Sequence, residues 1–267
     1  MNPIRIDDLD DPRLAPYRAL KATNLTRGRT EFIVEGRRLV ERLLASRHPT
    51  LSILALEREL PRMAALLDGK EGVASYMAEP ELVSRLVGFP FHQGVLGHGR
   101  RARDPGLGEI LGRPGRLGLV VCPRLSNPEN LGAIARTADV FGLDAIVVGP
   151  SCPDPFSRRV LRVSMGAVLN LPVVEPEDLT AVALELHETG RVELWGAVAR
   201  ADALAFDREP APERFALIMG EEDRGLEPAW LELCQRLVTI PMRAGASSLN
   251  VAVAAGVLIE RLTRSWR

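Results

Sequence analysis

Short apolar runs alternate with helical patterns throughout the C-terminal half of the chain. The first run, LGLVVC at residues 117–122, is continuously apolar. Similar runs follow at residues 144–149, 192–198, 215–220 and 236–242, and helical patterns lie at 131–142, 177–190 and 247–264. Continuous apolar runs are typical of strands that are buried on both faces of a parallel sheet. The alternation therefore predicts an α/β fold, a parallel sheet covered by helices on both faces.

The first hundred residues predict a second, smaller α/β unit. FIVEGRRLVERLL (32–44) carries Leu39, Val40, Leu43 and Leu44 at helical spacing. After it we expect a strand at 51–57, a helix at 61–68, a strand at 72–78 and a helix at 79–88, with a loosely ordered lead-in at 1–20. The stretch 99–116 is rich in Gly, Pro and Arg, which is typical of a linker. We therefore expect an N-terminal domain at 1–98, a linker at 99–116 and a C-terminal domain at 117–267.

Composition excludes several classes of protein. Hydrophobic residues make up 46% and charged residues 26% of the chain, as in ordinary globular proteins and unlike disordered or fibrous chains. No apolar run approaches the ~20 residues of a membrane-spanning helix, and the acidic, proline-broken N-terminus does not resemble a signal peptide. The three cysteines are far apart and form no zinc-ligand spacing. These features predict a cytoplasmic protein with reduced thiols and no metal.

Charge is unevenly distributed along the chain. Residues 1–116 hold 19 Lys+Arg against 15 Asp+Glu, whereas residues 117–267 hold 15 against 20. The N-terminal half therefore favours phosphates more than the C-terminal half does. Only two of the 34 basic residues are lysine. Coding bias explains this excess of arginine, and so does the ability of arginine to bind phosphate in bidentate geometry. Composition alone therefore does not identify nucleic acid as the partner.

Three polar loops follow three of the predicted strands. The first is 127–132, which opens a helix that carries Arg136; the second is 219–226; the third runs from Ile240 to Asn250. Because ligands of parallel α/β sheets bind at the carboxyl ends of strands, these loops are expected to converge on one site.

Each loop also has a purely structural interpretation. Asn130 and either Ser247 or Ser248 are candidate helix caps, and the acids at 221–223 fit a solvated turn. Capping does not explain Asn250, a poor helix former one turn inside an Ala/Val-rich helix. The dinucleotide-binding, P-loop and nucleophile-elbow motifs are absent, and the four histidines lie in no triad-like setting.

Taken together and in this order, the loops resemble a known set of motifs. NPENLGAIARTADVFGLDAIVV, LIMGEEDRGL and IPMRAGASSLNVAVAAGVLIE are similar to the three signature motifs of the SpoU-type (TrmH family) RNA 2′-O-ribose methyltransferases of the SPOUT superfamily. The resemblance extends to SMGAVLNLPV, HQGV and FIVEGRRLVERLL, and covers about residues 30–264. One departure is Ala252, where the family commonly has serine.

The resemblance implies a catalytic domain whose C-terminal segment forms a trefoil knot, and homodimers formed through that domain. The smaller N-terminal domain would be related to small ribosomal proteins and would bind RNA. The cofactor would be S-adenosylmethionine, bound at the knot by Gly220, Ile240 and Leu249, with Met242 as a wall. The alternation of strands and helices could not have predicted a knot, because knots are rare among folds.

The resemblance also implies a reaction, methyl transfer from the sulfonium to a ribose 2′-oxygen. Arg136 would act on the 2′-hydroxyl; because a guanidinium stays protonated, we expect it to stabilise the forming alkoxide, with an RNA phosphate as a candidate aid to proton removal. Asn130 and Asn250 would position the ribose or Arg136, and Glu222 would orient that arginine. Ser248 would shape its loop or bind the substrate.

Arg27, Arg29 and the RRAR run at 100–103 are candidate phosphate contacts. Ribosomal RNA is favoured as the substrate over transfer RNA, and an antibiotic-resistance enzyme is a further alternative. Other interpretations are a non-catalytic RNA-binding assembly factor on the same fold, a base methyltransferase and a nucleotide-sugar or small-ligand enzyme. The intact motif set disfavours the first, the NxGxxxR helix and SLN loop disfavour the second, and the missing phosphate loops disfavour the third.

Overall fold

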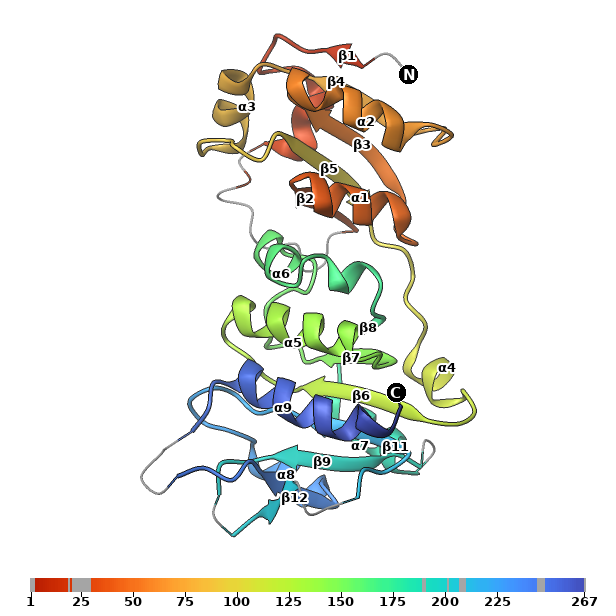
Figure 1. Ribbon diagram of the computed structural model, residues 1–267, viewed down its shortest axis with the longest axis vertical. Coiled ribbons are helices and arrows are strands. Elements are labelled where there is room, and N and C mark those ends of the chain that lie inside the picture. Colours follow the sequence, from red (N-terminus) through yellow and green to blue (C-terminus); the bar gives the residue numbers. More distant parts are fainter. Residues whose placement is uncertain are drawn as a thin grey trace. The chain divides into compact units, whose positions relative to one another are not determined.

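The chain forms two compact units (Figure 1) in a computed structural model that describes residues 3–18, 20, 30–188, 191–200, 202–206, 210–243 and 248–266. Unit 1 comprises Met1–Arg103 and Phe156–Asn170, and unit 2 comprises Asp104–Pro155 and Leu171–Arg267. The segment 156–170, which the sequence placed in the C-terminal domain, therefore belongs to unit 1. It does so because its side chains pack and pair with the first hundred residues, as described below.

Unit 1 contains a mixed sheet of five strands in the order β1-β4-β3-β5-β2. The strands are β1 (Ile4–Arg5), β2 (Glu31–Glu35), β3 (Thr50–Ala55), β4 (Ala74–Met77) and β5 (Val95–Arg100). β5 is antiparallel to both β2 and β3, whereas β4 is parallel to β1 and β3. The helices are η1 (Pro12–Tyr17), α1 (Arg37–Ala45), η2 (Glu57–Glu59), α2 (Leu60–Leu67), α3 (Pro80–Val87), α6 (Arg158–Val163) and η3 (Ala167–Leu169).

Three segments of unit 1 differ from the sequence prediction. Residues 31–35 form a strand, because Gly36 at φ 93° turns the chain before α1 begins, so the helical spacing applies only from Arg37 onward. The lead-in carries β1 and η1, and Tyr17 of η1 is buried with its hydroxyl 2.7 Å from that of Ser52. β5 was not predicted; a Cβ at Gly97 or Gly99 would crowd Leu43 of α1, so these glycines admit the helix closely.

Unit 2 contains seven strands in the order β10-β12-β9-β11-β6-β7-β8, and every pairing is parallel. The strands are β6 (Leu117–Cys122), β7 (Ala145–Val148), β8 (Val173–Val174), β9 (Glu193–Ala197), β10 (Leu204–Ala205), β11 (Arg214–Ile218) and β12 (Arg236–Thr239). The α/β fold with a parallel sheet is therefore confirmed. β6 and β7 are buried along their whole length, as their unbroken apolar sequences predict.

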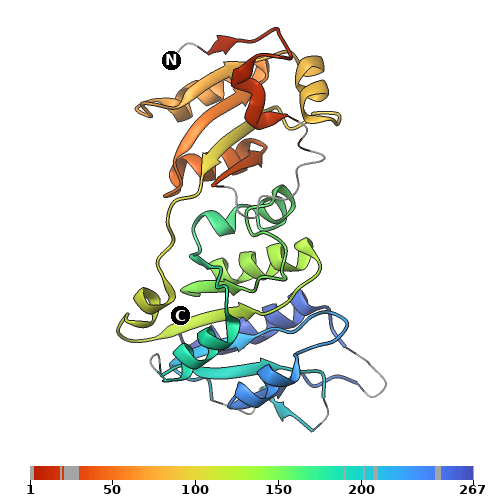
Figure 2. The same cartoon turned by 180° about the vertical axis from the view of Figure 1, so that it is seen from behind.

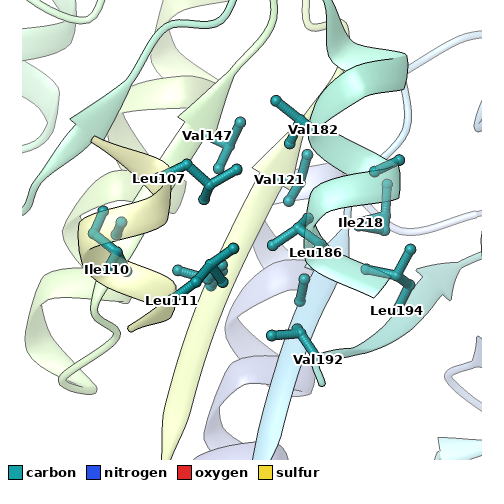
Figure 3. Packing of buried hydrophobic residues seen from close by; sticks show 14 of the residues in the cluster. Leu107, Ile110, Leu111, Val121, Val147, Val182, Leu186, Val192, Leu194 and Ile218 are labelled. Carbon is teal, nitrogen blue, oxygen red and sulfur yellow. The ribbon is translucent and has the colours of Figure 1, made fainter. Parts of the chain in front are cut away.

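Helices cover both faces of the sheet of unit 2, seen from opposite sides in Figures 1 and 2. These helices are α4 (Leu107–Leu111), α5 (Pro128–Val140), α7 (Leu179–Glu188), α8 (Pro228–Leu233), α9 (Val251–Thr263) and η5 (Arg264–Trp266). α5 and α9 contact each other, and Trp266 after α9 lies against Gly118 of β6 and the ring of Phe215. α4, α7 and α8 contribute to one apolar cluster with alternate strand residues (Figure 3).

α4 lies within the stretch 99–116 that was predicted to be a linker. Leu107, Ile110 and Leu111 of this helix are buried in the cluster of Figure 3, and the upstream end of the stretch belongs to β5. The Gly and Pro content hid three apolar residues at helical spacing, which is why composition alone misled the prediction. None of the helices in the described part of the chain is long and apolar enough to span a membrane.

Candidate functional site

Three residues from the three polar loops form one hydrogen-bonded chain at the carboxyl ends of the strands of unit 2. Asn130 Nδ2 donates to Glu222 Oε1 at 2.7 Å, and Asn250 Nδ2 donates to Asn130 Oδ1 at 3.0 Å. Asn130, the middle residue of the three, is 7% exposed, whereas Asn250 is exposed, so the hydrogen bonds lead from the interior of unit 2 to its surface. The convergence of the loops predicted from the sheet topology is therefore present in the structure.

The two helices that begin at this site, α5 and α9, are each capped by an asparagine. Asn127 is the N-cap of α5, because its side chain accepts from the backbone N–H of Glu129 at 2.8 Å, and Pro128 occupies the first turn. Asn130 is thereby released from the capping role considered for it. Asn250 is the N-cap of α9 and accepts from the N–H groups of Ala252 and Val253 at 2.9 and 3.2 Å. The helix thus begins later than predicted, and neither serine is needed as its cap.

Glu222 anchors the hydrogen-bonded chain as a carboxylate. Burial raises its pKa, but hydrogen bonds from Asn130 and from the backbone and hydroxyl of Ser126 outweigh this, so the pKa of Glu222 lies below its ordinary value. An ionised carboxylate only accepts hydrogen bonds. Asn130 must therefore direct its NH₂ group to Glu222 and its oxygen to Asn250, and Asn250 directs its oxygen to α9. The orientation of both amides follows from the charge on Glu222.

A cavity of about 650 Å³ lies beside this chain, wholly within unit 2. Its lining includes seven of the nine predicted site residues: Gly220, Glu222, Ile240, Met242, Ser248, Leu249 and Asn250. Leu249 is a large apolar residue, yet it is 41% exposed. An exposed apolar side chain on a concave surface is typical of a ligand-binding wall.

Gly220 has a structural role that the sequence did not reveal. A Cβ there would lie 2.3 Å from the carbonyl carbon of Gly225, because Glu221 and Gly225 pair across the loop. The missing side chain therefore lets the loop close on itself, and this closure carries Glu222 toward Asn130.

Arg136 belongs neither to the hydrogen-bonded chain nor to the lining of the cavity. Its side chain is exposed on α5, does not line the cavity and has no hydrogen-bond or ion-pair partner among the described residues. It stands about 9 Å along the helix axis from Asn130. The structure shows no contact between Glu222 and Arg136, so the expected orienting contact is absent. The reason is that both oxygens of Glu222 are already occupied by Asn130, Ser126 and Asn127.

Two residues of the site were missed by the sequence analysis. Ser126 holds the second oxygen of Glu222, with its hydroxyl at 3.1 Å. Arg124 bridges the first two loops through Glu221 at 3.5 Å and Glu227 at 3.4 Å. The Asn-Pro pair could have identified the cap at Asn127, but nothing in the sequence signals which acid of Glu221-Glu222-Asp223 faces inward.

The predicted phosphate contacts are otherwise engaged or lie outside the described residues. Arg27 and Arg29 belong to the latter group. Arg100 pairs with Glu31 at 3.1 Å, and the Arg101 guanidinium lies over the ring of Phe156 at 4.3 Å from its centroid. The described residues contain no group of three or more side chains that could hold a metal ion.

Comparison with known proteins places these features in a family. The sequence profile of the SpoU rRNA Methylase family matches residues 118–260. The chain is 36% identical to an uncharacterized tRNA/rRNA methyltransferase of Mycobacterium bovis, over 97% of this chain and 91% of that protein. It is 32% identical to the 23S rRNA (guanosine(2553)-2′-O)-methyltransferase RlmP of Bacillus subtilis, over 86% of this chain and 88% of that protein.

Solved structures give the same result. The SpoU methyltransferase AviRb of Streptomyces viridochromogenes, solved in complex with AdoMet, is 27% identical and has a TM-score of 0.82, covering 96% of this chain and 99% of that one. A structure described as an RNA 2′-O ribose methyltransferase is 28% identical with a TM-score of 0.79, covering 98% and 99% of the two chains.

Proposed function

The chain belongs to the SpoU rRNA methylase family and is an RNA 2′-O-methyltransferase, and on this premise we propose that it methylates ribosomal RNA with S-adenosylmethionine bound in the cavity of unit 2. The observation that carries the proposal is the chain Asn250–Asn130–Glu222 at the lip of that cavity. It joins the three motif loops of the family in one site.

The residues of the cavity fit this cofactor. Ile240, Met242 and Leu249 supply an apolar wall suited to the adenine ring, and the lining also includes charged residues of both signs: Glu221, Glu222, Asp223, Arg200 and Arg224. The structural neighbour AviRb was solved with AdoMet, which supports the same cofactor here. When bound, the cofactor supplies the electrophilic methyl group, so the protein needs to position and stabilise the attacking ribose.

The residues around the cavity divide this work. Asn130 and Asn250 have committed their amide oxygens, so toward a ligand they present only N–H donors. The depressed pKa of Glu222 and its four donors make it a poor proton acceptor. Arg136 is the cation available to stabilise negative charge on the 2′-oxygen, since the described residues leave its guanidinium without a partner. Ser248, exposed on the cavity wall, is placed to bind substrate.

We assign the trefoil knot of the family to the segment from β12 through α9. Its support is topological: β12 lies between β9 and β10, yet α9, which follows it, contacts α5, the helix after β6. The chain thus returns across the sheet after forming the third loop. A knot would hold that loop over the cavity.

We assign a homodimer contact to the outer surface of α5 and α9. Val140, Val253 and Val257 are 71%, 54% and 37% exposed, an unusual amount of apolar surface for two helices in contact. A groove lined by Phe141 and Gly256 lies beside them. Light scattering of the wild type and of Val253→Glu tests this assignment: we expect a dimer and a monomer, respectively, and a monomeric wild type would contradict it.

Unit 1 is proposed as the RNA-binding domain, related to small ribosomal proteins, and the cytoplasm as the place of action. The N-terminal charge surplus and the reduced cysteines support these two assignments. Ribosomal RNA is favoured over transfer RNA because the relative RlmP is named for 23S rRNA.

The test is transfer of tritium from labelled S-adenosylmethionine into total RNA from a strain that lacks this protein, followed by nucleoside analysis. We expect label in one 2′-O-methylated nucleoside of the ribosomal RNA fraction. Label in transfer RNA would change the substrate, and label in a methylated base would contradict the reaction. No cofactor binding at all would favour the non-catalytic RNA-binding alternative.

A further inference from the structure

Two segments far apart in the sequence meet in unit 1 and concentrate positive charge there. Residues 36–50, which hold α1, and residues 156–170, which hold α6, contain seven arginines and one glutamate. The whole chain carries a net charge of −1, so this local excess is not a general property of the protein.

Direct contacts hold the two segments together. Arg42 Nη1 donates to the carbonyl of Met165 at 2.5 Å, and Arg47 Nη1 donates to the carbonyl of Asn170 at 2.8 Å. A Cβ built at Gly166 would lie 3.3 Å from Cδ of Arg42, so the aliphatic part of that arginine passes over this glycine. Met165 and Gly166 both have positive φ, so the backbone turns just after α6, where the Met165 carbonyl accepts from Arg42 of α1.

The acceptors in these contacts are neutral. A carbonyl accepts a hydrogen bond without cancelling the charge of the guanidinium, and a guanidinium has five N–H donors. Arg42 therefore keeps its charge and most of its donors. Arg38, one turn earlier on α1, and Arg162, one turn before Met165 on α6, are both exposed. Among the described residues, no carboxylate pairs with Arg38, Arg42 or Arg162.

The other arginines of the two segments are used differently. Arg158 is partly buried, with 17% of its side chain exposed, and contacts Glu35 at 2.7 Å and the ring of Phe89. Arg37 lies 3.8 Å from Glu41. Arg159 is partly buried. The four exposed arginines of the two segments form what we call the arginine strip: Arg38, Arg42, Arg47 and Arg162.

We propose that this arginine strip binds the phosphodiester backbone of the substrate RNA. The inference rests on the proposed function and deepens it, because it replaces the engaged Arg100 and Arg101 with four other residues. Planar guanidinium groups suit phosphate oxygens in bidentate geometry. Contacts to the backbone fix the position of an RNA without reading its sequence. The segment 156–170, matched by the catalytic-domain profile, thereby contributes to RNA binding.

The experiment compares full-length Arg38→Gln, Arg162→Gln and the double variant with Arg85→Gln. Arg85 is an ideal control, since it is also an exposed helical arginine of unit 1 with no partner among the described residues. It lies on α3, which packs on the opposite face of the sheet from α1, over the cluster that contains Leu54 and Leu96. Binding of a fluorescein-labelled RNA hairpin is measured by anisotropy across a salt series.

Each strip variant is expected to bind the hairpin about tenfold more weakly, the loss of one charge-assisted hydrogen bond. The slope of log affinity against log salt is expected to fall by about one for each arginine removed. S-adenosylmethionine affinity and thermal stability should not change, and KM for ribosomal RNA should rise with kcat retained. Unchanged hairpin binding in the strip variants, or an equal loss of affinity in Arg85→Gln, would overturn the proposal that the strip binds RNA. Failure of the wild type to transfer methyl would overturn the proposed function, while the hairpin measurement would still decide the strip.

Discussion

The two units differ in where they bury polar side chains. Of the nine buried polar or charged residues in the described chain, six lie in unit 1 and three in unit 2. In unit 1 they lie inside the packed layers, as the buried Tyr17–Ser52 pair shows. In unit 2, β6 is apolar and buried along its length, and the buried amide of Asn130 lies beyond its end, next to the cavity.

This difference separates structural from functional polarity. A buried polar group is tolerated when it is hydrogen-bonded, and in unit 1 such bonds connect elements of the fold to one another. For Asn130 of unit 2 the same requirement is met at the carboxyl edge of a parallel sheet, where ligands bind. Changes to the buried polar groups of unit 1 should therefore affect stability, and changes to the hydrogen bonds around Asn130 should affect catalysis.

The largest expected effect is on the stability of unit 1. Arg158→Met leaves the carboxylate of Glu35 buried without its partner and should destabilise unit 1 by about 3 to 5 kcal/mol. All three tryptophans, Trp195, Trp230 and Trp266, lie in unit 2. The urea midpoint measured by circular dichroism should fall. The midpoint measured by tryptophan fluorescence should not change if the two units unfold independently.

The matched control for this variant is Arg200→Met in unit 2. Its pair with Asp202 is fully formed at 2.6 Å but exposed to solvent, so its removal should leave the denaturant midpoint nearly unchanged. Coincident shifts of both signals in Arg158→Met would show that the two units unfold as one.

The next effect is on catalysis in unit 2. Arg136→Ala should lower the rate of methyl transfer by about a hundredfold or more, because it removes the cation proposed to stabilise the 2′-oxygen. S-adenosylmethionine binding, measured by calorimetry, should not change, since Arg136 does not line the cavity. Near-native turnover would refute the proposed role.

A pH dependence should distinguish unit 1 from unit 2. Burial, followed by the charges of Arg47 and Arg101, lowers the pKa of His48 from 6.5 to about 4. Between these values the unfolded chain binds a proton that the folded chain excludes, so unit 1 loses stability as pH falls from about 6.5 to 4. The full difference corresponds to about 3 kcal/mol.

His48→Asn is the variant that tests this dependence. Asparagine offers an oxygen in place of Nδ1, which accepts from the N–H of Ala102 at 3.0 Å, and it cannot be protonated. Denaturant midpoints measured by circular dichroism from pH 7 to pH 4 should fall less steeply than in the wild type. An unchanged slope would assign the acid sensitivity to other groups.

The smallest effect concerns the hydrogen-bonded chain of unit 2. Glu222→Gln replaces one acceptor by a donor, so one of the bonds from Asn130 and Ser126 is lost, at a cost of about 2 kcal/mol. Cofactor affinity should fall about tenfold. Glu227→Gln, which alters only an exposed pair with Arg124, should change it little; equal effects would show that the chain does not shape the cavity.

The sequence by itself determined the parallel sheet of unit 2 and the meeting of its three polar loops. Unbroken apolar runs fix buried strands because their side chains require cover on both faces, and the three loops must then share one edge. The motifs identified seven residues that line the cavity. These are local properties, so they can be read from neighbouring positions along the chain.

Only the tertiary structure decided which partner each polar group has. It assigned 156–170 to unit 1, placed β5 antiparallel between β2 and β3, and turned Glu222 toward Asn130, away from Arg136. Each of these depends on contacts between residues distant in sequence, which apolar periodicity does not encode. Which of these contacts form depends on the burial, charge and hydrogen-bond geometry of groups that only the fold brings together.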